Sequence, residues 1–138
     1  MIHTIKFLTL LILLTGLQAE DEAAKNDPDK AGGTIYISNQ SFDIPSIHLT
    51  VTLNGKKLAD QSFAVNRQHT WISFKATYKM GSNTIRIQTK DGKVVAQTSF
   101  KLKKGPMNAV ISFWKSEEDE TPNGYITFYL SPDQIKFK

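Results

Sequence analysis

The chain contains no cysteine, so it can form neither a disulfide nor a thiolate metal site, and it has no cysteine nucleophile. Histidine is scarce, with three copies in 138 residues. The sequence also lacks a Gly-x-Ser-x-Gly elbow, a paired-histidine zinc motif, a Walker loop and a dinucleotide-binding fingerprint. Catalysis therefore has little support, and we predict a non-enzymatic protein with no catalytic residues, no cofactor and no bound metal.

Long apolar runs are absent except near the start of the chain. Residues 1–19 carry a positive charge at Lys6, an apolar segment from Phe7 to Leu14, and small or turn-forming residues up to Ala19. This order is typical of a cleaved secretory signal peptide. A retained membrane anchor is the alternative, but the run is shorter than the about 20 residues that span a bilayer. We expect a secreted or periplasmic protein with no stable membrane anchor after cleavage.

An excess of one charge is also lacking, since the formal net charge is only +4 and both signs are spread along the chain. The densest basic stretch is Lys101, Lys103 and Lys104, and Lys56 and Lys57 form a second one. Such lysines are typical of solvated strand faces and of strand edges that avoid pairing with other chains. The mixed charge and the predicted export both argue against nucleic acid as a partner.

Two segments follow the predicted signal peptide. Residues 20–33 are acidic at first, then rich in lysine, aspartate and glycine, and they offer little to bury, so we predict a flexible charged linker. Residues 34–138 are predicted to form one domain, because they are too few for two comfortable ones.

Apolar and polar residues alternate through most of the domain, which is the period of half-buried β-strands. Asn54-Gly55 and Asp91-Gly92 are tight hairpin signals, and an irregularity is expected near Ala59-Asp60. No helix is predicted after the signal peptide. The alternation is centred on residues 35–37, 47–53, 58–65, 72–78, 85–87, 94–102, 109–113 and 126–130, and it returns at 135–137.

This pattern predicts an all-β domain of seven or eight strands. A single sheet would leave one apolar face in water, so two sheets must stack face to face. Short hairpins favour antiparallel neighbours. The expected fold is therefore a two-sheet antiparallel sandwich, of the immunoglobulin-like or the jelly-roll type.

Aromatic residues on the polar side of the predicted strands are the clearest positive sign of function. Rings grouped on one face of a sheet offer a flat surface on which sugar rings can stack. The alternative is that the rings pair across strands for stability alone, or that a bulge turns them inward. The candidate ligand-binding residues are Trp71, Tyr125, Tyr129, Trp114 and His69.

An acidic loop is predicted at residues 116–124, with Glu117, Glu118, Asp119 and Glu120 in succession. Carboxylates are suitable calcium ligands, but four in a row mostly diverge, which favours a solvated loop. The same carboxylates are the only basis for a small exported hydrolase, which stays an alternative function.

Three short segments carry a family resemblance. Asn39-Gln40-Ser41-Phe42, Leu53-Asn54-Gly55-Lys56 and Gln68-His69-Thr70-Trp71 are similar to segments of small exported bacterial β-sandwich proteins without an assigned activity. The Leu-Asn-Gly-Lys hairpin and residues 81–85 also resemble parts of carbohydrate-binding and immunoglobulin-like modules. These segments encode turns and strands, so the resemblance implies a fold and assigns no binding residue.

The sequence thus predicts an exported binding module whose partner is a glycan or an extracellular protein. One alternative is a structural or inhibitory protein that docks through an exposed sheet edge. The hydrolase is the other.

Overall fold

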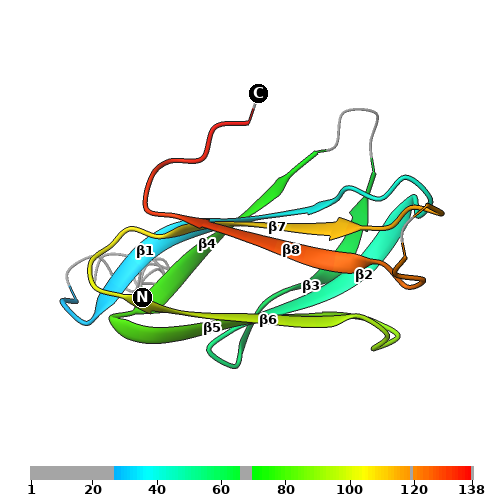
Figure 1. The fold of residues 1–138 in the computed structure, drawn as a ribbon. Helices are drawn as coiled ribbons and strands as arrows, with labels where there is room; N and C mark the ends of the chain where they lie inside the picture. Colours follow the sequence, from blue (N-terminus) through cyan, green and yellow to red (C-terminus); the bar gives the residue numbers. More distant parts are fainter. Residues whose placement is uncertain (1–26, 66–69, 119, 138) are drawn as a thin grey trace, which may run out of the picture.

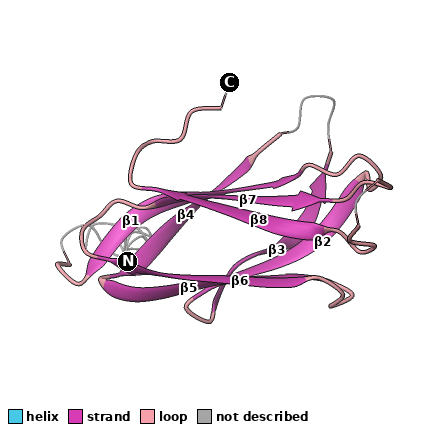
Figure 2. Cartoon of the chain, viewed as in Figure 1, coloured by secondary structure: helices cyan, strands magenta, loops and turns pink. Residues whose placement is uncertain are grey.

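The chain forms eight β-strands and no helix within residues 27–65, 70–118 and 120–137, which are the residues that the computed structural model describes (Figure 2). The predicted signal peptide, residues 1–19, and the candidate residue His69 lie outside this range. No helix in the described part of the chain is long and apolar enough to cross a membrane. The strands are β1 (Lys30–Asn39), β2 (Ser46–Leu53), β3 (Lys56–Ala64), β4 (Ile72–Lys79), β5 (Gly81–Thr89), β6 (Val95–Leu102), β7 (Asn108–Trp114) and β8 (Tyr125–Ser131).

The strands form two four-stranded sheets, with the orders β4-β1-β7-β8 and β3-β2-β5-β6. Figure 1 shows β7 and β8 in one layer and β5 and β6 in the other. Five of the six pairings among the described strands are antiparallel, as predicted, but β1 and β7 run parallel. Hairpins make antiparallel pairs of consecutive strands; β1 and β7 are far apart in the chain, so no hairpin sets their direction.

One apolar core lies between the sheets, because each strand turns alternate side chains inward. Phe63 on β3 meets Phe74 on β4 edge to face at 6.3 Å, and Tyr78 on β4 meets Phe100 on β6 in the same way at 5.6 Å. Each of these contacts joins one sheet to the other. The buried apolar residues come from both sheets: Ile35, Ile37, Ala76, Tyr78, Ala109, Ile111 and Phe113 from one, and Leu49, Val51, Leu53, Ala59, Phe63, Ile85, Ile87 and Leu102 from the other.

The turns follow the predicted chemistry. Asn54 and Gly55 join β2 to β3 with φ values of 52° and 80°, a conformation that asparagine and glycine tolerate better than other residues. The register of β3 against β2 shifts at Leu58, which has no partner between the pairs that Ala59 and Lys57 make. This bulge lies next to the predicted irregularity at Ala59-Asp60.

The predicted linker, residues 20–33, overlaps the first strand, because β1 begins at Lys30 rather than near Thr34. Gly33 is needed here for close packing. A Cβ at this position would lie 1.6 Å from the carbonyl oxygen of Met107, whereas a Cβ on Gly32 would meet nothing within 4 Å. Gly32 and Gly33 therefore resemble linker residues in the sequence, but in the structure they belong to the paired strand β1.

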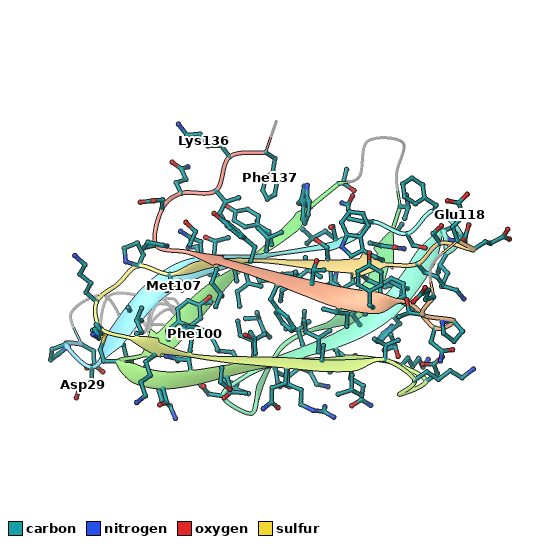
Figure 3. The ribbon with its side chains drawn as sticks, viewed as in Figure 1. Asp29, Phe100, Met107, Glu118, Lys136 and Phe137 are labelled. Atoms are coloured by element: carbon teal, nitrogen blue, oxygen red, sulfur yellow. The ribbon has the colours of Figure 1, made fainter. Side chains whose placement is uncertain are left out.

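The end of the chain also differs from expectation. The alternation at residues 135–137 suggests a strand, but β8 is the last strand and the segment after Ser131 has no regular pairing. Figure 3 shows Phe137 on the side of its layer that faces away from the other sheet. The segment after Ser131 packs against this outer face instead of pairing as a strand, which explains why Phe137 is apolar.

We expect Gly33→Ala to lower the free energy of unfolding by about 2 kcal/mol or more, because strand β1 must shift away from Met107. Gly32→Ala is the matched control and should change it by less than about 1 kcal/mol, or raise it, since its added methyl group meets open space. Urea unfolding followed by circular dichroism measures both. Equal effects of the two changes would contradict the close packing at Gly33.

Candidate functional site

The outer face of the sheet β4-β1-β7-β8 carries a group of aromatic side chains. Tyr36 on β1 lies opposite Ser73 on β4 and Val110 on β7, and Val110 lies opposite Tyr129 on β8. A continuous row of side chains thus crosses all four strands, with a ring on β1 and a ring on β8. We call the following six residues the aromatic face: Tyr36, Trp71, Trp114, Tyr125, Tyr129 and Phe137.

One end of the aromatic face is a cluster of three rings in contact. Trp71, which immediately precedes β4, stacks on Phe137 with ring centroids 4.6 Å apart and planes 19° apart. Phe137 also meets Tyr36 edge to face at 5.0 Å. The tail after β8 therefore returns across the sheet and places its ring on the tryptophan. One flat surface of Trp71 is occupied by the protein itself.

The other aromatic residues are spread over β7 and β8. Trp114 lies opposite Tyr125 in the β7–β8 register, and its indole Nε1–H donates to the Thr127 hydroxyl at 3.0 Å. That hydrogen bond holds the indole against the sheet. Tyr125 is 38% exposed and Tyr129 is 61% exposed, so both rings offer surface to solvent.

Four of the five predicted site residues thus share one face, and the structure does not describe the fifth, His69. The alternation of apolar and polar residues in β7 and β8 is enough to predict that Trp114, Tyr125 and Tyr129 point outward. Phe137 was not among the predicted site residues, because its spacing from Ile135 resembled strand alternation. Tyr36 is also absent from the predicted site residues, and its contact with Phe137 adds it to the site.

A polar cluster that no sequence motif marks lies on the outer face of the other sheet. Asp60 accepts hydrogen bonds from the imidazole Nε2 of His48 at 2.8 Å, from the Thr50 hydroxyl at 3.0 Å and from the Lys57 ammonium group at 2.8 Å. The Ser62 hydroxyl is 3.5 Å from Nδ1 of His48. The four residues His48, Thr50, Asp60 and Ser62 lie on paired strands β2 and β3.

Serine, histidine and aspartate together suggest nucleophilic catalysis, but the geometry favours a stabilising role. A general base lies about 2.6–3.2 Å from the group that it deprotonates, and the Ser62 hydroxyl is at the outer limit of a hydrogen bond. Lys57 also contacts the same carboxylate, so Asp60 is the acceptor of a surface ion pair. The Lys57, His48 and Thr50 donors together hold the pKa of Asp60 well below its usual range.

The remaining titratable groups add no second site. The described residues contain no cluster of three or more histidine, aspartate or glutamate side chains that could hold a metal ion. Of the predicted acidic loop, Glu117, Glu118 and Glu120 are exposed, and Asp119 lies outside the described range. Tyr78 is fully buried, and burial raises its pKa to about 12, so the phenol stays neutral in the core.

Two comparisons with known proteins give no match. A scan against models of known protein families finds no match, and a search of curated proteins finds no significant match to the chain. No residue role can therefore be transferred to this chain, and any function must be argued from its own side chains.

We expect Lys57→Gln to raise the pKa of Asp60 toward its ordinary value of 3.8, because the first and largest cause of the lowered pKa is the Lys57 hydrogen bond. Since the folded-state pKa of Asp60 is depressed, the stabilisation from this carboxylate is present above pH 3.8 and is lost as the pH falls below it. Lys57→Gln should therefore reduce the loss of stability on acidification.

Carbon-detected NMR titration of the aspartate carboxyl groups measures that pKa. Lys56→Gln is the matched control, because it removes the same charge from the next residue, which makes no ion pair within the described part of the chain. An Asp60 pKa that is unchanged by Lys57→Gln, or changed equally by Lys56→Gln, would contradict the assigned hydrogen bond.

Proposed function

We propose that the protein is an exported, non-enzymatic binding module that recognises a glycan or an extracellular protein through its aromatic face. The export part of the proposal rests on the signal-like residues 1–19. The binding part rests on the placement of Trp71, Trp114, Tyr125 and Tyr129 on the same outer surface.

The observation that carries the proposal is the exposure of these rings across adjacent strands. A ring that serves only to stabilise the sheet buries most of its surface, yet Tyr129 is 61% exposed in the middle of β8. Aromatic rings combine a large apolar area with few rotatable bonds, so they are efficient contact groups for sugar rings and protein side chains. The exposed Thr127, which lies between Tyr125 and Tyr129 on β8, adds a polar partner.

The contact between Phe137 and Trp71 supports the same interpretation. It shows that the indole surface accepts a flat ring at stacking distance. A ligand ring that took this place would displace the tail, and binding would then compete with the internal contact.

The fold within this proposal is a general two-sheet sandwich. In an immunoglobulin constant domain the first two strands share one sheet. Here β1 and β2 lie in different sheets, so we do not assign the immunoglobulin-like subtype.

Docking through a sheet edge is the second predicted mode, and one observation favours a particular edge. Strands β3 and β4 both carry pairs of lysines, which discourage pairing with another strand. Strand β8 is an edge strand without any charged residue. Edge docking would therefore use β8, which also carries Tyr125 and Tyr129.

We expect Trp71→Ala and Tyr129→Ala each to weaken binding at least about tenfold, because each removes a ring worth more than about 1.4 kcal/mol of contact. A glycan array probed with the labelled protein, followed by titration of each hit, measures this. Tyr78→Phe is the control, because it changes a tyrosine that lies in the core and not on the aromatic face. Binding that survives both aromatic changes would rule out the aromatic face as the binding surface.

We expect Phe137→Ala to expose Trp71, because its stacked partner is removed. Acrylamide quenching measures this in a Trp114→Phe background, where Trp71 is the remaining tryptophan. Quenching should increase, and any glycan identified on the array should bind more tightly. Phe42→Ala is the control, since Phe42 is 77% exposed and lies in the loop before β2. Unchanged quenching would contradict the tail contact.

A further inference from the structure

A hollow of about 370 Å³ opens between β3 and β4, which are edge strands of the two opposed sheets. Its volume lies within the range of pockets that hold small ligands. Leu58 contributes apolar lining and Asn54 and Thr77 contribute polar lining, while Leu53 and Tyr78 border the hollow as buried core residues. Among the residues that the structure describes, no acidic side chain lines it, but five lysines do: Lys30, Lys56, Lys57, Lys75 and Lys79.

Three of these lysines lack a counter-charge. Lys30 pairs with Asp27 at 3.3 Å, and Lys57 pairs with Asp60 at 2.8 Å. Within the described part of the chain, the other three make no ion pair: Lys56 on β3, and Lys75 and Lys79 on β4. Lysines from both sheets therefore border one hollow, and because these three have no ion-pair partner among the described residues, a bound anion would neutralise their charge.

The two sides of the hollow are held together by Asn83, which is 1% exposed. Its Nδ2 donates to the carbonyl oxygens of Lys79 at 2.7 Å and Gly81 at 3.1 Å. Its Oδ1 accepts from the backbone N–H of Lys79 and from Nδ2 of Asn54, both at 2.9 Å. This buried amide joins the β2–β3 hairpin to the end of β4, so the hollow is formed before any ligand arrives.

Protection of sheet edges explains some edge lysines but not this grouping. If protection were the only reason, the other edge strands would carry similar charge. Strand β6 has a single lysine, Lys101, and β8 has no charged residue. Within the edge strands themselves, lysines are therefore concentrated on β3 and β4.

We propose that this hollow binds the phosphate or sulfate ester group of a small ligand, of the size of a charged monosaccharide. Lys56, Lys75 and Lys79 supply the positive charge, since an ammonium group binds such an anion as a compact point charge. Leu58, which the bulge in β3 leaves unpaired, lies beside the carbon skeleton of the ligand. This site is separate from the aromatic face and does not depend on it.

The direct test is an NMR titration of the ¹⁵N-labelled protein at fixed ionic strength with glucose 6-phosphate, glucose 6-sulfate and glucose. Saturable shifts of the amides of Asn54, Leu58 and Thr77 are expected with one or both esters and not with glucose. A response to one ester alone identifies the anion, phosphate or sulfate, and supports the proposal. No saturable shift with either ester, or equal shifts with glucose, would overturn it.

Paired variants separate a defined site from a general charge effect. Lys56→Gln with Lys79→Gln should weaken ester binding at least about tenfold, because two charge-assisted contacts are lost. Lys90→Gln with Lys93→Gln removes the same charge from the β5–β6 turn, outside the hollow, and should change affinity less than about twofold. Equal losses in both pairs would overturn the proposal. Trp71→Ala should leave ester binding intact, so failure of the aromatic face is distinguishable from failure of this site.

Discussion

Two-residue alternation of apolar and polar side chains is the constraint on which the rest of this structure depends. In β1, Ile35 and Ile37 are fully buried, and Tyr36 between them points outward to the aromatic face. A slip of one residue against β4 would expose both isoleucines and bury the tyrosine hydroxyl. The core and the aromatic face are therefore two results of the same register.

Two buried asparagines hold that register between the sheets. Asn39 at the end of β1 donates through Nδ2 to the carbonyl oxygens of Ile44 at 2.9 Å and Phe63 at 3.2 Å, and Phe63 belongs to the other sheet. Asn83 on β5 makes the corresponding connection to Lys79 on β4. An apolar core is non-directional and tolerates sliding, whereas a buried amide left without partners costs about 1–3 kcal/mol. The asparagines thus give the contact between the sheets its specificity.

The sequence predicts whatever depends on near neighbours in the chain. The strands from β2 to β8 follow from alternation, and the β2–β3 turn follows from Asn54-Gly55, whose positive φ values require such residues. Contacts between distant segments leave no comparable pattern. The parallel pairing of β1 with β7 and the close approach of Gly33 to Met107 are of this kind.

The candidate sites divide in the same way. Trp114, Tyr125 and Tyr129 could be assigned to one face because their strands are adjacent and strictly alternating. Phe137 reaches that face by folding back, which its own spacing does not reveal. The hollow could not be predicted from the sequence, because its lysines come from β1, β3 and β4 and meet only when the two sheets are stacked.

Strand β4 connects the two proposed surfaces, because Trp71 of the aromatic face immediately precedes it and two lysines of the hollow lie on it. At about 3.3 Å per residue, Lys75 lies about 13 Å along the strand from Trp71, beyond the Debye length of about 8 Å at physiological ionic strength. The positive charge of the hollow is thus largely screened at the rings, for which we propose binding through apolar contact. The same lysines keep the β3 and β4 edges from pairing with another chain. The proposed anion binding at this edge therefore does not conflict with folding, because the lysines that discourage pairing with another chain are the same ones that would bind the anion.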